Sequence, residues 1–192
     1  MSTPRAENLR RHQDRAWTRE QWSGRGRPVH LINDPSFDRS AWWPVAAGLA
    51  ADCAVAVFDP PGHGDAGDLA DDLASFTAGS GTRAPIVVGH ESAALVAAVF
   101  AARYLAHAVV AVEHYLDTAE SPCPELRAIV DGSRSFGCPY LSVFALAPRD
   151  GYTDWLRRRA PAARCEVYET PAPFPHLRRA ERFTDDLRAL AS

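Results

Sequence analysis

The sequence predicts an α/β fold with a mainly parallel sheet of about six strands, covered by helices on both faces. Short apolar runs alternate with segments of helical periodicity, and strands that alternate with helices pair in parallel. Some of these runs, such as Cys53 to Phe58, are apolar at successive positions, as in strands buried on both faces. A chain of 192 residues with 46% hydrophobic content is long enough for one sizeable core.

The N-terminal part differs in composition from the rest. Residues 1–25 are polar, with Trp17 and Trp22 as their large aromatic groups, and Arg5 to Arg15 can form a helix. We therefore expect a polar N-terminal arm over residues 1–25 and a single domain over residues 26–192.

Each expected element follows from local pattern. Apolar runs predict strands at 29–32, 53–58, 85–88, 108–112, 140–146 and 166–169. Helical spacing predicts helices at 41–51, 69–76, 92–104, 125–130, 154–159 and 180–191. Ser40 can cap the first helix, and the uniformly apolar helix at 92–104 is expected to be buried.

The carboxyl ends of the strands are where a site is expected in a parallel sheet of this kind. The segments that directly follow the predicted strands there are 33–36, 59–64, 90–92, 113–115, 149–154 and 171–176.

Composition excludes several classes of protein. A net charge of −3 argues against a basic nucleic-acid footprint, so no nucleic-acid partner is expected. The stretch from Ala93 to Val112 is apolar but contains Arg103 and His107, and no membrane span is expected. The polar N-terminus has no signal-peptide core, and the four cysteines form no Cys-x-x-Cys pair, so we expect a cytoplasmic protein with reduced thiols.

Four motifs in order give the chain from about residue 28 a resemblance to a known family. They are 58–64 (Phe-Asp-Pro-Pro-Gly-His-Gly), 88–94 (Val-Gly-His-Glu-Ser-Ala-Ala), the strand and loop at 143–150, and 174–177 (Phe-Pro-His-Leu). Together they resemble the α/β-hydrolase family, in which a Gly-x-Ser-x-Gly elbow, an acid and a histidine follow one another in this order. The resemblance implies an α/β-hydrolase fold with Glu91 at the nucleophile position, Asp150 as the acid and His176 as the histidine.

The chain departs from the family pattern at the elbow and at the oxyanion loop. Glu91 replaces the nucleophilic serine, and Ala93 replaces the following glycine. Asn33-Asp34-Pro35 stands where the family has its oxyanion loop, and proline has no backbone N–H to donate. We take Asp34, Pro35 and Ser92 as the expected oxyanion and pocket residues.

The segment between Tyr115 and Gly137 is too short for the helical lid that many members of the family insert there. We therefore expect a fold without a cap domain, whose pocket is lidless unless the N-terminal arm covers it.

Two carboxylates beside one imidazole would stabilise its charged form, so the resemblance predicts a charged His176 between Glu91 and Asp150. Carboxylate attack on an ester would need an oxyanion hole, which disfavours serine-type ester hydrolysis. We expect a hydrolase of non-peptide small molecules in which Glu91 is the nucleophile or a base that activates water.

Two other functions stay open on the sequence. One is a non-hydrolytic acid–base enzyme of a biosynthetic pathway, such as a cyclase, isomerase or lyase. The other is a catalytically silent α/β-hydrolase-like binding protein.

A metal or cofactor is not expected. His90-Glu91 begins like a His-Glu-x-x-His zinc helix, but the second histidine position holds Ala94. The sequence predicts neither a metal ion nor a cofactor, names only a small-molecule substrate as partner, and leaves the oligomeric state open.

Overall fold

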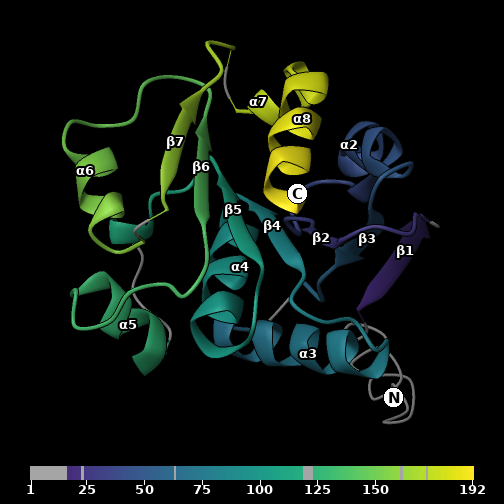
Figure 1. The fold of residues 1–192 in the computed structure, drawn as a ribbon, viewed down its shortest axis with the longest axis horizontal. Helices are drawn as coiled ribbons and strands as arrows, with labels where there is room; N and C mark the ends of the chain where they lie inside the picture. The colour runs from purple at the N-terminus through teal and green to yellow at the C-terminus, as the bar shows by residue number, and fades with distance from the viewer. Residues whose placement is uncertain (1–16, 23, 63, 119–122, 161, 172) are drawn as a thin grey trace, which may run out of the picture.

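The computed structural model describes residues 17–22, 24–62, 64–118, 123–160, 162–171 and 173–192. They form a seven-stranded sheet in the order β1-β3-β2-β4-β5-β6-β7, with β1 antiparallel to β3 and every other pair parallel (Figure 1). The strands are β1 Thr18–Trp22, β2 Pro28–Ile32, β3 Ala54–Asp59, β4 Ile86–His90, β5 Ala108–Val112, β6 Tyr140–Phe144 and β7 Arg164–Val167.

Helices lie between the strands and cover both faces of the sheet (Figure 1). They are α2 Trp43–Leu49, α3 Ala66–Gly79, α4 Ser92–Arg103, α5 Pro124–Val130, α6 Tyr152–Arg157, α7 Pro175–Arg178 and α8 Ala180–Ala191, with short 3-10 turns η1 Arg39–Trp42 and η2 Leu116–Thr118. No helix of the described part of the chain combines the length and apolarity needed to cross a membrane.

Strand alternation divides the core into two layers. In β3, Val55 and Val57 pack with α2 and α8, whereas Ala56 and Phe58 face the opposite layer with α3 and α4. Successive side chains of a strand point to opposite faces, so an apolar strand fills both layers. This explains why the central strands read as continuous apolar runs.

The predicted α/β class, with a mainly parallel sheet covered on both faces, is confirmed. Between β5 and β6 the described residues form only η2 and α5, so no cap domain is evident there. The helix expected at Arg5 to Arg15 lies outside the described residues.

Strand β1 was not expected, because its sequence lies within residues 1–25, the segment that we interpreted as a polar arm. Thr18–Trp22 instead pairs antiparallel with β3, from Thr18 opposite Asp59 to Trp22 opposite Val55. An edge strand has one solvent-exposed side and tolerates polar residues, which removes the apolar signal used to find strands.

The β4 to α4 turn brings backbone unusually close to Gly89. A Cβ added at Gly89 would lie 2.2 Å from the carbonyl oxygen of Ala93. Because the obstacle is backbone, only a shift of the helix start or of the strand end could relieve the contact.

We expect Gly89→Ala to lower the free energy of unfolding by about 2 kcal/mol or more, because the methyl group collides with the first turn of α4. Urea denaturation measures this. Gly79→Ala is the matched control, since a Cβ at Gly79 meets nothing within 4 Å, and it should be neutral or slightly stabilising. Equal effects of the two changes would contradict the close approach at Gly89.

Candidate active site

Three carboxylates follow three neighbouring strands at the same edge of the sheet. Strands β2, β4 and β5 are adjacent, with Ile32 opposite Gly89 and His90 opposite Val112. Asp34, Glu91 and Glu113 come one or two residues after these strands end. The parallel register therefore brings them to one region, where sites of such sheets lie.

Glu91 occupies a sharp turn between β4 and α4. Its backbone has φ 51° and ψ −121°, a conformation that costs a non-glycine residue about 1–3 kcal/mol. The Glu91 N–H donates to the Val112 carbonyl at 3.0 Å, and the side chain is 44% exposed. This geometry presents the carboxylate to solvent above the sheet, as the elbow motif predicts.

Asp34 occupies the backbone donor that follows the elbow. Its Oδ2 accepts the N–H of Ser92 at 3.1 Å and also the Ser92 hydroxyl, while Oδ1 accepts the Ser36 N–H at 2.8 Å. Burial alone would raise the pKa of Asp34, but these hydrogen bonds outweigh it and lower the pKa. An ionised carboxylate thus sits where an acyl oxyanion would need the Ser92 N–H.

The two glutamates are less easily ionised than Asp34. Partial burial and then the charge of Asp34 raise the pKa of Glu91. Burial raises the pKa of Glu113 as well, the Ala145 N–H that its carboxylate accepts opposes this, and the charge of Glu91 adds to the rise. The order of ionisation across the three strands is set by which neighbour is already charged.

His90 lies beside Glu91 as a neutral imidazole. Its Nε2 is 3.1 Å from the Pro173 carbonyl and 4.0 Å from Glu91 Oε1. A carbonyl only accepts, so Nε2 carries the proton. Burial lowers the pKa of His90, although the Pro173 hydrogen bond and the charge of Asp34 oppose the shift.

His176 is buried among rings, with only 1% of its surface exposed. Its ring centroid lies 4.5 Å from Trp42, 4.9 Å from His90 and 5.8 Å from Phe183. Burial, followed by the nearby His90, lowers the pKa of His176 to about 3. The predicted charged His176 is therefore wrong: at neutral pH the ring is uncharged, because desolvation acts on it and no carboxylate contacts it.

Asp150 is not brought into contact with that ring. It is exposed in the loop between β6 and α6, and the Nδ1 atom of His176 is buried without a hydrogen-bond partner in the described structure. The predicted pairing of Glu91, His176 and Asp150 through hydrogen bonds is thus not formed here.

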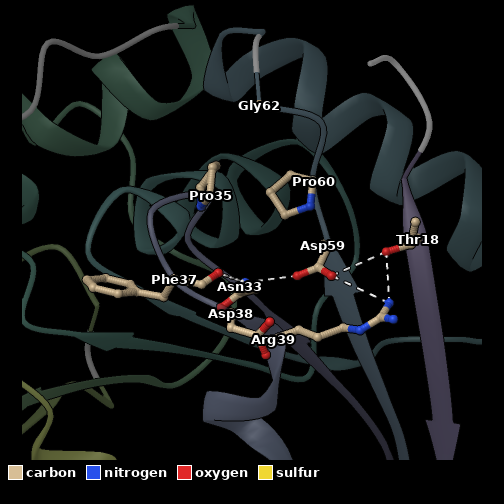
Figure 2. A pocket seen from close by; sticks show the side chains of 9 residues that line it. All are labelled: Thr18, Asn33, Pro35, Phe37, Asp38, Arg39, Asp59, Pro60 and Gly62. Atoms are coloured by element: carbon tan, nitrogen blue, oxygen red, sulfur yellow. Dashed lines mark hydrogen bonds and ion pairs between the residues drawn. The ribbon is translucent and has the colours of Figure 1, made fainter. Parts of the chain in front are cut away.

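A pocket of about 360 Å³ opens next to the Asp34 loop (Figure 2). Phe37 forms part of its wall and also packs on His90, with ring centroids 5.4 Å apart, so the pocket and the Glu91 site share a side chain. Its lining comprises Thr18, Asn33, Pro35, Phe37, Asp38, Arg39, Asp59, Pro60 and Gly62. The predicted pocket residue Pro35 lines it, whereas Asp34 and Ser92 lie at the elbow.

Asp59 organises the polar wall of this pocket (Figure 2). Its carboxylate accepts the Asn33 side-chain N–H at 2.8 Å and the Thr18 hydroxyl at 3.3 Å, and Arg39 lies 3.5 Å away. Strand β1, the loop after β2 and the end of β3 are thereby linked. Among the described residues, no group of three or more His, Cys, Asp or Glu side chains is placed to hold a metal ion.

Glu113 is a site residue that the sequence reasoning did not single out. The signal was present, because Glu113 follows β5 directly, just as Glu91 follows β4. Both also have positive φ, 53° and 51°. Its segment was among those expected at the sheet edge, but no motif marked the side chain.

Comparison with known proteins identifies the family. The profile of the alpha/beta hydrolase family matches residues 14–191, and the chain belongs to this family. None of the curated proteins compared with the chain matches it.

Solved structures with the same fold include several enzymes. An esterase of Thermogutta terrifontis has 17% identity and a TM-score of 0.68, over 92% of this chain and 94% of that one. The enol-lactonase of Burkholderia xenovorans LB400 has 14% identity and a TM-score of 0.69, over 91% and 95%. A Pseudomonas aeruginosa protein provisionally described as an epoxide hydrolase has 14% identity and a TM-score of 0.73, over 92% and 94%. At these identities the likeness establishes the fold alone.

The buried, neutral His176 predicts a loss of stability in acid. Its pKa is about 3 in the folded chain against 6.5 ordinarily, so below pH 6.5 the unfolded chain binds a proton that the folded chain does not. The free energy of unfolding should fall as pH drops from 6.5 towards 3, by up to ~1.4 kcal/mol per pH unit from this group. Urea denaturation at pH 7 and 4.5 should find a smaller fall in His176→Phe.

Phe183→Leu serves as the packing control for that comparison. It alters the same ring cluster without removing a titrating group, so its effect should be equal at both pH values. A fall of the same size in His176→Phe and in the unmodified chain would contradict the assignment.

Asp34 on the Ser92 N–H also predicts the outcome of restoring the family's nucleophile. Glu91→Ser should hydrolyse p-nitrophenyl acetate no faster than Glu91→Ala, because the backbone donor for the oxyanion is already occupied. Spectrophotometric release of nitrophenol measures both rates. A vigorous esterase from the serine change alone would mean that Ser92 N–H is available.

Proposed function

We propose that this chain is a small-molecule enzyme whose reaction runs through the Glu91 carboxyl group, and that it hydrolyses non-peptide substrates at a saturated carbon. The observation that carries the proposal is the pair formed by the strained Glu91 turn and the Asp34 carboxylate on Ser92. Strained turns persist where surrounding structure maintains them, and they are concentrated at functional sites.

The Asp34 contact argues against acyl substrates. An ester or amide carbonyl passes through an oxyanion that needs preorganised donors. In this chain Asp34 accepts from Ser92 through the backbone N–H and the hydroxyl, and Pro35 has no N–H. Attack on a saturated carbon has no acyl oxyanion, so it does not require those donors.

Glu91 has two chemically reasonable roles in such a reaction. Its carboxylate can attack the carbon and form an ester intermediate, or it can remove a proton from an attacking water. Both roles need the ionised form and access to substrate, and the Glu91 side chain is 44% exposed. The predicted partners His176 and Asp150 stay in the proposal as residues to be tested, without the proton donation that a charged His176 would have supplied.

A catalytically silent binding protein is the second candidate. The observation that favours it is His176, whose Nδ1 has no hydrogen-bond partner in the described structure and whose pKa is about 3. A non-hydrolytic acid–base enzyme is the third candidate, favoured by the raised pKa values of Glu91 and Glu113.

The decisive experiment uses styrene oxide, 1,2-epoxyhexane and 1-bromobutane as probes. We expect turnover of at least one probe and a loss of about 100-fold or more in Glu91→Gln, because the amide neither attacks carbon nor accepts a proton from water. Gas chromatography with mass detection measures the products. Glu169→Gln is the control, since Glu169 is an exposed glutamate with a similar backbone, φ 51°, after β7.

Labelled water separates the candidate reactions. In a single turnover in H₂¹⁸O, carboxylate attack leaves the label on Glu91 and water activation places it in the product. His176→Gln and Asp150→Asn tested in the same assay decide whether either residue takes part. Absence of turnover of all three probes, or turnover that Glu91→Gln leaves intact, would overturn the proposed function.

A further inference from the structure

Glu113 lies one strand away from Glu91 in matching position. His90 and Val112 pair across β4 and β5, so the two glutamates follow paired residues at the same edge of the sheet. Neighbouring strands are about 4.8 Å apart, which places these side chains within reach of one another. Glu113 keeps a positive φ of 53°, and such an outlier at a site edge calls for an explanation in function.

The Glu113 carboxyl group is held in one orientation. Its Oε1 accepts the N–H of Ala145, just after β6, and the Glu113 N–H donates to Val143. Oε1 is thereby committed as an acceptor, which leaves Oε2 as the atom that can carry a proton. A fixed carboxyl group with one free oxygen has the form of a proton donor.

The surroundings of the pair contain more negative than positive charge. Asp34 faces Glu91 from the loop after β2, the neutral His90 lies 4.0 Å from it on β4, and no described arginine forms an ion pair with either glutamate. Arg149, beyond β6, pairs with Asp117 instead. With Asp34 ionised and Glu91 ionising next, Glu113 is the carboxyl group that keeps its proton longest.

We propose that Glu113 is the general acid of this site and donates the proton of Oε2 to the leaving oxygen in the reaction proposed for Glu91. The inference rests on the proposed function. It fills the role that His176 cannot fill as a neutral, buried ring. Two carboxyl groups kept in different protonation states divide the tasks of base and acid between them.

The proton balance of the step is complete with water and an epoxide. Glu91 takes one proton from the water whose oxygen forms the new bond to carbon. The carbon–oxygen bond of the epoxide breaks, and its oxygen takes the proton of Glu113. Transfer of the proton from Glu91 to Glu113 through solvent then restores both groups, and the net change is the addition of water.

The first test follows both carboxyl groups by ¹³C NMR titration, without substrate. We expect Glu113 to titrate at higher pH than Glu91, and its midpoint to fall by about half a pH unit or more in Glu91→Gln, which removes the neighbouring charge. Glu169→Gln should leave that midpoint unchanged. A Glu113 that titrates below Glu91, or that ignores the loss of its charge, would overturn the assignment.

The second test measures turnover of the epoxide probes as a function of pH. Glu113→Gln keeps an oxygen that can accept the Ala145 N–H but has no proton to give, so the fold should be retained. We expect kcat to fall by about 100-fold with KM nearly unchanged, and the alkaline limb of the pH profile to disappear.

The outcomes distinguish the two proposals. Full activity with an unchanged pH profile in a folded Glu113→Gln variant would overturn the role of Glu113 alone. No turnover by the unmodified chain would overturn the proposed function, and the acid role with it, while the titration would still decide whether the two carboxyl groups are coupled.

Discussion

The left-handed turn at Glu91 is the constraint on which the site depends. A glutamate keeps φ 51° only because β4 before it and α4 after it are fixed by the core, with Gly89 leaving room for the Ala93 carbonyl. The same turn fixes the first N–H of α4, and Asp34 reaches across from β2 to accept it. Strain at one residue thus determines both where the carboxylate points and which backbone donor lies beside it.

Burial, more than charge, determines the state of the histidines in this site. Desolvation disfavours an imidazolium, and a nearby carboxylate can reverse this only by direct contact. His176 has aromatic neighbours, with Trp42 at 4.5 Å, and its pKa is about 3. His90 is nearer to carboxylates, yet its pKa is still lowered. Acid chemistry at this edge of the sheet therefore falls to carboxyl groups.

Most of the fold could be predicted because its strands and helices have strong local signals. Ala108–Val112 and Ala180–Ala191 have the predicted bounds, since their apolar pattern needs no information from elsewhere in the chain. Strand β1 gives no such signal, because its polar residues are stabilised by pairing with β3. A pattern records which face is buried, whereas an exposed edge depends on its partner.

The site was predictable only in part. The elbow motif located Glu91, because a strand, a glycine and a helix start are local features. The surroundings of His176 involve Trp42 and Phe183, which are distant in sequence, so neither its burial nor the lack of a contact with Asp150 could be derived from spacing. Asp34 was expected near an anion, but its bond to Ser92 depends on the packing of β2 against β4.

The Asp34 and Ser92 contact also has a consequence for how such a site can change in evolution. Loss of the serine nucleophile and occupation of the backbone donor are separate alterations, on two loops joined only through space. A lineage in this state gains nothing from reverting either position by itself, so selection for esterase activity has no first step to act on. The carboxylate that fills the donor works as a ratchet, and it leaves the family's usual chemistry harder to regain than to lose.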